Sequence, residues 1–446
     1  MVDEQNPLAV RLEAAASALE ADLGPAGLRP DERSLLHSLG YDDDKRTRNG
    51  DRARMLRAAA KFRRLFRLGV PDAPGVTFFG GEADPAILGA RHKGAALGNL
   101  AGSGLTTERA FEACVGEGIE YLSQFVDDND PVERGMLGRY AGAYDEATRR
   151  FVSAVLADAR DDVSWIPARR LADGGTAWFP LDLCLRRPQT EQDLSPPLKL
   201  STGCAAGPTI EAATLRAALE LIERDAVALW WRGGRRGRAI APDSEAGRAA
   251  ADLLDGARLG SDERRTWLLD ITTDVAVPAV AALSTRADGY GFAFGLAARL
   301  SLAEAAPAAL FELFQVELGQ HVVAAKRQES GDEALNDTDR RQLRRATLFD
   351  TSDCALLRPD GGADALSSIE AEGPAAGLAH VLGRFEALGI AAYAIDLTRR
   401  ALGVPVVRVL APGLQLEPCQ IVGPRLARLI SETGGGALHT GGLPLL

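Results

Sequence analysis

Two pairs of glutamates carry the most distinctive chemistry that this sequence offers. Glu117 and Glu120 form one pair, and Glu220 and Glu223 form the other, with Arg224 directly after it. Residues three apart lie on the same face of an α-helix, so the two carboxylates of each pair project together. If the two helices faced one another, four carboxylates would converge, and oxygen ligands in that number suit Mg²⁺. Such an ion keeps part of its shell for phosphate oxygens, which Arg224 would also bind.

Taken singly, a Glu-x-x-Glu pair is a weak sign, because such pairs are common on solvated helix faces. The segment LELIERDAVALW (219–230) is different, since apolar residues surround its two glutamates on almost every side. A helix that is apolar nearly all round is buried, and buried carboxylates need partners. We therefore predict that Glu220 and Glu223 lie inside the protein, next to a cation.

A third apolar helix is predicted in SLAEAAPAALFELFQVE (301–317), where Glu312 and Gln315 are again three residues apart. Taken alone this spacing indicates little, because a glutamine beside a glutamate on a buried helix equally fits capping or bridging of neighbours. Together with the two glutamate pairs, it offers a third source of polar groups for the same site.

The sequence contains an internal repeat around these residues. GLTTERAFEACVGEGIE (104–120) and GPTIEAATLRAALELIE (207–223) share seven of seventeen positions at an offset of 103. DITTDVAVP (270–278) and DLTRRALGVP (396–405) form a second pair, in which Asp-x-Thr leads through proline into a β-like run. These copies predict a core with a pseudo-twofold repeat, and they are too few for a solenoid.

Periodicity predicts a mixed α/β (α+β) fold that follows a helical N-terminal extension over residues 1–75. Short β-rich segments such as GVTFFGG and AWFPLDLCL alternate with helices. The predicted helices span 8–23, 52–68, 107–126, 145–159, 209–231, 302–325 and 376–388, and a loop is predicted over about 328–340.

The stretch from Lys45 to Arg67 is strongly basic, with ten Lys or Arg and one Asp. Its apolar residues follow helical spacing, which favours an amphipathic helix over 52–68 packed on the protein surface. A sharper hypothesis is a docking face for an acidic partner or peptide, presented by Arg57, Arg63 and Arg64.

Composition excludes several classes of function. The chain has 446 residues and a net charge of −11, so bulk electrostatics do not favour nucleic-acid binding. Its five cysteines are scattered without a C-x-x-C, which argues against a zinc site and suits a reducing compartment. The N-terminus lacks a secretory pattern and no apolar run is long enough to span a bilayer. We therefore predict a cytoplasmic location, with no membrane or nucleic-acid partner.

In combination and order, these motifs resemble those of the YcaO family. The stretch LKLSTGCAAGPTIEAATLRAALELIERDAVALW (198–230) is similar to its central ATP-binding segment, and GSGLTTERAFEACVGEGIEYLSQF (102–125) to its first Glu-x-x-Glu element. DITTDVAVPAVAA (270–282) fits the pattern D-x-T-x₅-P-x₃-A, and ELFQ (312–315) fits Glu-x-x-Gln. The resemblance runs from about residue 76 to near the C-terminus, and it predicts one catalytic domain over 76–446.

The resemblance implies an enzyme that binds ATP through Mg²⁺ and activates peptide-backbone amides. In azoline-forming members, a Cys, Ser or Thr side chain attacks the preceding carbonyl, the oxygen is phosphorylated, and phosphate leaves as the ring closes. It further implies a ribosomally made precursor peptide as substrate and a separate leader-binding or E1-like partner protein. A homodimer is the default expectation. The implied metal ligands are Glu117, Glu120, Glu220 and Glu223, and the implied nucleotide-site residues are Ser201, Glu211, Arg224, Glu312 and Gln315.

Three departures from the family pattern keep other functions open. The family's Gly-Lys-Gly is Gly102-Ser103-Gly104 here, Tyr121 replaces an arginine that often follows the first glutamate pair, and the chain ends GGLPLL instead of Pro-x-Pro-x-Pro. A cyclodehydratase is the leading prediction. The alternatives are a thioamide-forming enzyme that works with a helper protein, and a non-catalytic nucleotide-binding scaffold. No catalytic base is identified from the sequence.

Overall fold

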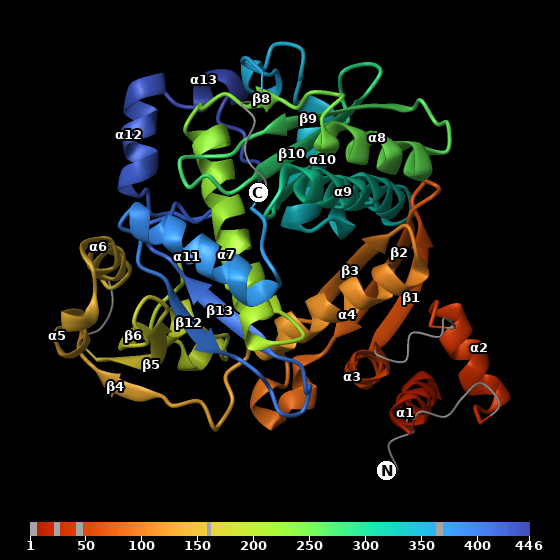
Figure 1. Cartoon of the computed structure of the whole chain (residues 1–446), viewed down its shortest axis with the longest axis horizontal. Coiled ribbons are helices and arrows are strands. Elements are labelled where there is room, and N and C mark those ends of the chain that lie inside the picture. Colours follow the sequence, from red (N-terminus) through yellow and green to blue (C-terminus); the bar gives the residue numbers. More distant parts are fainter. Residues whose placement is uncertain (1–6, 22–26, 42–47, 158–161, 363–368) are drawn as a thin grey trace.

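The computed structural model describes residues 7–21, 27–41, 48–157, 162–362 and 369–446. Three antiparallel sheets, with helices between and around them, make up the mixed α/β fold that the sequence predicts (Figure 1). Among the described residues, no helix combines the length and the apolar character that crossing a bilayer requires.

The N-terminal region is helical up to residue 59, with α1 (Pro7–Glu20), α2 (Pro30–Ser38) and α3 (Asn49–Ala59). The predicted helix over 52–68 is wrong beyond that point, because the chain forms strand β1 (Arg64–Gly69) instead. β1 pairs along its whole length with β2 (Thr77–Ala83). Phe66 lies over Gly80, in space that a β-carbon there would occupy. This cross-strand packing outweighs the local helical spacing.

The first sheet has the order β1-β2-β3, and β3 spans Gly98–Gly104. Helix α4 (Thr107–Ser123) follows β3 directly and packs back on β2 and β3. β1 comes from the predicted N-terminal extension, so that segment and the rest of the chain share a sheet. The domain boundary near residue 76 stays a prediction.

Helix α9 (Leu302–Ser330) packs on the second sheet and also contacts β3 of the first sheet. α8 (Glu245–Arg258) lies against α9, and the two helices share an apolar core with this sheet. The strand order is β11 (Ala293–Ala298), β10 (Ala279–Arg286), β9 (Arg264–Asp270) and β8 (Arg238–Ala239).

Helix α7 (Ile210–Val227) packs on the last two strands of the third sheet, β13 (Val406–Leu410) and β7 (Cys204–Ala206), and continues into one π-helical turn, Ala228–Arg232. α11 (Pro374–Ala387) packs on α7. The strand order is β4 (Glu133–Gly135), β5 (Val163–Arg170), β12 (Tyr393–Asp396), β13 and β7, and β6 (Thr176–Pro180) pairs with β5.

The predicted loop over 328–340 is mostly wrong. α9 continues to residue 330, and α10 (Asp337–Leu348) begins only a few residues later. Asn336 and Asp339 form a reciprocal capping box at its start, which explains how a polar stretch opens a helix. The remaining helices are α5 (Leu137–Tyr140), α6 (Glu146–Val155), α12 (Pro424–Thr433) and α13 (Ala437–Thr440).

The Asp-x-Thr segments adopt the same local structure in both copies. The Asp270 carboxylate accepts a hydrogen bond from the Thr272 N–H, and the Thr272 hydroxyl accepts one from the Ala279 N–H. In the second copy, the same bonds join Asp396 to Thr398 N–H and the Thr398 hydroxyl to the N–H of residue 406. Each set closes the turn between two antiparallel strands. The pseudo-twofold relation of the whole core stays a prediction.

All five cysteines are free and buried. Burial raises the pKa of Cys114, Cys184 and Cys204 to about 12 in each case. These thiols are therefore protonated at neutral pH.

Candidate functional site

Three helices carry most of the polar residues predicted for the site, and each follows a strand through a hydroxyl N-cap. The Thr106 hydroxyl accepts from the Arg109 N–H at the start of α4, and the Thr209 hydroxyl accepts from the Ala212 N–H at the start of α7. Ser301 caps α9 in the same way. Such caps satisfy a free helical N–H and fix where the helix begins, and hence which face each later residue occupies.

One glutamate near the middle of each helix bends back to the backbone of the strand region that precedes the helix. Its carboxylate accepts a hydrogen bond from a main-chain N–H, which orients a charged group that packing alone would leave free. The three bonds are Glu117 to Ala101 N (2.5 Å), Glu220 to Gly203 N (3.1 Å) and Glu312 to Leu296 N (2.6 Å).

Glycines in the strands allow the helices to approach this closely. A β-carbon on Gly102 of β3 would overlap backbone atoms of Ala110 and Cys114 in α4. A β-carbon on Gly295 of β11 would overlap backbone atoms of α9 in the same way. The close contact of strand and helix brings each carboxylate within reach of a strand N–H.

Glu120 links α4 to the third sheet, because its carboxylate accepts from the Ala206 N–H at 2.7 Å. Burial raises the pKa of Glu120 to about 8, and the carboxylates of Glu220 and Glu117 add to the increase. Burial likewise raises the pKa of Glu117 to about 7, although part of its side chain remains open to solvent. The two glutamate pairs therefore face one another closely enough to interact electrostatically.

Arg224 is the cation of this cluster. Its Nη2 lies 3.4 Å from Glu220 Oε1 and 3.5 Å from Glu223 Oε1. Burial lowers the pKa of Arg224, but the nearby carboxylates of Glu223, Glu220 and Glu312 raise it by more, so the net pKa is raised. Burial also raises the pKa of Glu223 and of Glu312, and Arg224 limits both increases. The Nε of Arg224 is buried without a hydrogen-bond partner among the described residues.

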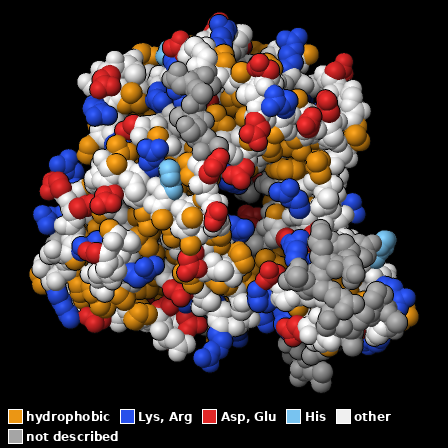
Figure 2. Space-filling view, viewed as in Figure 1, with side chains coloured by type: hydrophobic (Ala, Val, Ile, Leu, Met, Phe, Trp, Pro, Cys, Tyr) orange, Lys and Arg blue, Asp and Glu red, His pale blue; other side chains and the backbone are white. Residues whose placement is uncertain are grey.

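Three carboxylates, those of Glu220, Glu223 and Glu312, thus share Arg224, and Glu117 and Glu120 of α4 lie beside them. This excess of negative charge suits a divalent cation. In the described part of the chain, no three Asp, Glu, His or Cys side chains are close enough to hold a metal by themselves. Pairs of carboxylates fit Mg²⁺, which takes one or two protein carboxylates and completes its shell with water and phosphate oxygens. Figure 2 shows this face of the molecule hollowed near its centre, with both acidic and basic side chains around the opening. In Figure 1, α7, α4 and α9 surround the same place.

Gln315 and Ser103 join α9 to β3. Gln315 Nε2 donates to Ser103 Oγ at 3.0 Å, and that hydroxyl donates to the Phe311 carbonyl at 3.3 Å. Ser103 is buried and is the middle residue of Gly102-Ser103-Gly104, where the family resemblance leads us to expect a lysine. Sequence reasoning noted the missing lysine but not this contact, which only the packing of β3 on α9 reveals.

Ser201 and Glu211 lie differently from the other predicted residues. Ser201 is exposed in the turn before β7, two residues before Gly203, which binds Glu220. Glu211 is exposed in the first turn of α7. It is nine residues before Glu220, or about 13 Å along the helix axis at the α-helical rise. The structure does not bring Glu211 into the carboxylate cluster.

Asp225 is a residue that sequence reasoning missed, although it directly follows Arg224. It is fully buried, accepts from the Gln415 N–H at 2.8 Å and pairs with Arg425 at 3.0 Å. These contacts tie the end of α7 to the C-terminal segment. The signal in the sequence was an aspartate inside an otherwise apolar stretch.

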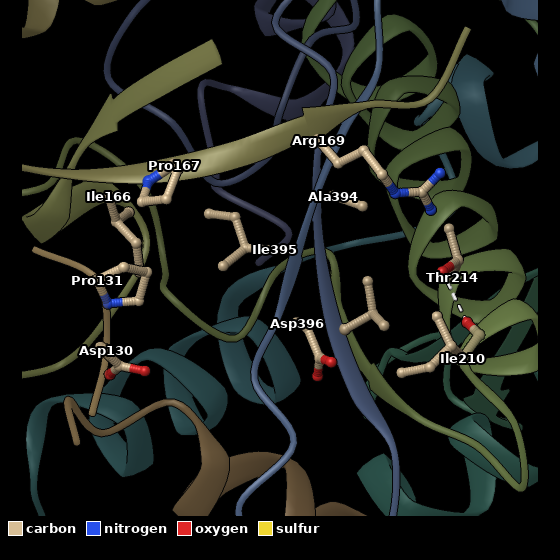
Figure 3. A pocket seen from close by; sticks show the side chains of 11 residues that line it. Asp130, Pro131, Ile166, Pro167, Arg169, Ile210, Thr214, Ala394, Ile395 and Asp396 are labelled. Atoms are coloured by element: carbon tan, nitrogen blue, oxygen red, sulfur yellow. Dashed lines mark hydrogen bonds between the residues drawn. The ribbon is translucent and has the colours of Figure 1, made fainter. Parts of the chain in front are cut away.

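A separate cavity of about 380 Å³ lies beside the start of α7, between β5 and β12 (Figure 3). Arg169 and Asp396 point into it from the two strands, and Asp130 at its edge pairs with Arg399 at 2.7 Å. None of the residues predicted for the site lines this cavity. The carboxylate cluster, not this cavity, is the candidate functional site.

Comparison with known proteins agrees with this geometry. The family model described as YcaO cyclodehydratase, ATP- and Mg²⁺-binding, matches residues 101–415. A search of curated protein sequences finds no significant match.

Solved structures share the fold at low sequence identity. A heterocyclase in complex with substrate and cofactor superposes with a TM-score of 0.65 at 20% identity, covering 90% of this chain. This chain spans only 54% of that protein's length. The YcaO protein from Methanopyrus kandleri, bound with AMPPCP and Mg²⁺, gives 0.58 at 20% identity over 83% of this chain and 91% of its own. The E. coli microcin synthetase McbBCD complex gives 0.54 at 15%, over 78% and 88%.

The matched segment contains all three helices of the carboxylate cluster and spans well over half of the sequence. On this ground the chain belongs to the YcaO family of ATP- and Mg²⁺-binding enzymes.

Proposed function

We propose that this protein is an ATP- and Mg²⁺-dependent cyclodehydratase that forms azoline rings in a ribosomally made peptide. The observation that carries the proposal is the cluster in which α7 and α9 place three carboxylates around Arg224, with the glutamate pair of α4 beside them. Burying carboxylates between these helices costs free energy that apolar side chains would not cost. The cluster is therefore explained by a cationic ligand. The description of the matching family and the heterocyclases of similar fold support ring formation as the reaction.

The reaction joins a side chain to the backbone of the same peptide. The thiol or hydroxyl of a Cys, Ser or Thr gives up its proton and adds to the carbonyl carbon that precedes it, forming the new ring bond. When bound, ATP supplies the phosphoryl group that turns the former carbonyl oxygen into a phosphate leaving group. Loss of that phosphate and of the amide proton gives the carbon–nitrogen double bond, so that the peptide loses one water overall.

The residues of this chain hold and neutralise the charged groups. We assign the glutamate pairs of α4 and α7 to Mg²⁺, because backbone N–H groups orient the carboxylates of Glu117, Glu120 and Glu220. Arg224 binds phosphate oxygens as a second cation. We place Glu312, Gln315 and Ser201 at the nucleotide. Glu211 lies at the start of α7, so we assign it to the nucleotide only if part of the nucleotide extends to that end of the helix.

The proposal includes a precursor peptide and a separate leader-binding or E1-like partner that presents it. The E. coli microcin synthetase is itself a complex, which supports a partner in this system too. Homodimerisation and a cytoplasmic location are further parts of the proposal.

Calorimetric titration tests the nucleotide site. We expect wild-type protein to bind ATP only with Mg²⁺, and Glu220→Ala to lose that binding. Glu432→Ala is the matched control, because Glu432 is exposed on α12 and pairs only with Arg428. Binding that survives Glu220→Ala, or that needs no Mg²⁺, would contradict the assignment.

Product mass then identifies the chemistry once a peptide and partner are added. Loss of water from the peptide supports ring formation, whereas exchange of oxygen for sulfur identifies a thioamide-forming enzyme. Mg²⁺-dependent ATP binding with an unchanged peptide mass identifies a nucleotide-binding scaffold.

A further inference from the structure

Strand β1 leaves one edge of the first sheet open. All six of its residues pair with β2, and within the described ranges no strand pairs with its other side. Five of the six residues are exposed. Figure 1 shows β1 at the outer edge of this sheet, away from α4 and α9. Its outward N–H and C=O groups are thus available to another chain.

The open edge also exposes large apolar side chains. Phe66 is 40% and Leu68 is 37% exposed, and the two lie on the same face because they are two residues apart in a strand. Exposed apolar side chains on an edge strand invite pairing, and charged residues such as Arg64 and Arg67 of β1 restrict which segments can add. This exposure therefore indicates a surface that a further strand covers.

The charge of this region is concentrated on β1 and not on the helix before it. The α3 arginines are neutralised within the chain: Arg52 pairs with Glu108, and Arg57 with Glu20. By contrast, the side chains of Lys61 and Arg63 have no partner among the described residues, and Arg64 lies 3.8 Å from Glu82. Lys45 to Thr47, the start of the basic stretch, fall outside the described residues.

Charge opposes a second copy of this chain at the edge in some registers of pairing. Two β1 strands would pair antiparallel about a twofold axis. Centring that pairing on Leu65 places Arg63 opposite Arg67, and centring it one half-step later places Arg64 opposite Arg67. Like charges directly across a sheet destabilise the pairing. Centring it on Phe66 instead places Arg64 opposite Leu68 and Arg67 opposite Leu65, without like charges across the pair. The same arginines attract carboxylates, so charge selects an acidic strand.

We propose that β1 is the docking edge for an acidic, extended polypeptide segment that adds to the first sheet as a fourth strand. Main-chain hydrogen bonds supply the pairing, carboxylates of the segment face Arg63, Arg64 and Arg67, and its apolar residues cover Phe66 and Leu68. This replaces the predicted basic helix with a strand as the acidic-partner surface. Binding of such a segment to β1 needs no ATP or Mg²⁺, so it can be tested independently of the proposed reaction.

Fluorescence anisotropy with the full chain tests the proposal. The probe is a fluorescein-labelled peptide in which glutamate alternates with valine. We expect saturable binding that weakens with salt, persists in Glu220→Ala, and falls at least about tenfold in the double variant R63E/R67E. The control R150E/R428E changes the charge equally at exposed ion pairs on α6 and α12. It should bind like the wild type.

Hydrogen exchange distinguishes strand addition from charge attraction alone. Binding should slow exchange at alternate β1 amides, those that do not bond to β2, and a probe N-methylated at alternate residues should not bind. Absence of saturable binding, or equal binding of the N-methylated probe, would overturn the proposal. So would sedimentation of the free protein as a dimer whose β1 amides are already protected, because a second copy would then be the occupant.

Discussion

Glu120 shows how the surroundings of a single residue determine its chemistry. It accepts one backbone N–H, yet burial and two neighbouring carboxylates still raise its pKa to about 8. A proton therefore competes with a metal for this carboxylate near neutral pH. The predicted metal site is one that Mg²⁺ must enter by displacing protons.

This competition predicts a pH dependence of stability. Because the folded pKa of Glu117 is about 7 and that of Glu120 about 8, the metal-free folded protein keeps protons that the unfolded chain releases from about pH 5 upward. The free energy of unfolding should consequently fall as pH rises through this window. Urea unfolding without Mg²⁺ at several pH values measures the slope. Glu120→Gln cannot ionise and should flatten it, so an unchanged slope in that variant would contradict the raised pKa.

Ser103 carries a second prediction at this scale. Ser103→Ala removes the hydrogen bonds to Gln315 and to the Phe311 carbonyl in a buried place, which should lower the free energy of unfolding by about 1 kcal/mol. The freed Gln315 should also weaken Mg²⁺-dependent ATP binding. Urea unfolding and calorimetry measure the two effects. The exposed Ser352→Ala is the control, and equal behaviour of both variants would argue against the contact.

At the scale of elements, the site depends on how closely strands and helices pack. Gly295→Ala would force β11 and α9 apart, because the new methyl group overlaps backbone that cannot turn aside. We expect a loss of about 3 kcal/mol in stability, by overpacking, together with weaker ATP binding as Glu312 is displaced. Chemical denaturation and calorimetry provide the measurements.

Gly256 in α8 offers the matched substitution. A β-carbon there meets no atom within 4 Å. Gly256→Ala should therefore stabilise the protein by about 0.5–1 kcal/mol through helix propensity. If Gly256→Ala and Gly295→Ala changed stability by the same amount, the result would contradict a role of Gly295 in close strand–helix packing.

The sequence predicted those elements whose periodicity agrees with their packing. Apolar spacing placed α4, α7 and α9 and showed which carboxylates share a face. The apolar spacing wrongly predicted a helix over 60–68, because Phe66 packs over Gly80 and no local pattern reveals that contact. Sequence reasoning assigned Glu211 to the nucleotide site from family position alone, and that assignment stays a prediction; helix geometry separates Glu211 from Glu220 along α7. The hydrogen bonds between glutamates and strand N–H groups depend on tertiary contacts, which the sequence does not state.

At the scale of the whole molecule, the N-terminal helices are anchored on the helix that carries the first glutamate pair. Arg52 is fully buried, pairs with Glu108 of α4 at 2.7 Å and lies over the Tyr41 ring at 4.8 Å. Arg48 binds Glu108 and Glu112 on the same helix. The N-terminal region thus supports α4 from the side opposite the site.

Replacing the buried arginine tests this support. Arg52→Met leaves Glu108 with one cation fewer and should lower stability by about 3 kcal/mol. It should also weaken ATP binding if α4 shifts. Thermal unfolding and calorimetry give both values. Arg54→Met breaks only an exposed pair with Asp51 and should change stability by less than about 0.5 kcal/mol. A stability loss as large as that of Arg52→Met would contradict the special role of the buried arginine.

The burial of every cysteine has a practical consequence for handling the protein. Thiol reagents react with exposed thiolates, and this chain presents none, since its five sulfhydryls are enclosed and protonated. A single cysteine introduced on an exposed helix would therefore be the sole labelling position under native conditions. Dyes or spin labels attached there could follow motions of the folded chain without removing any native residue.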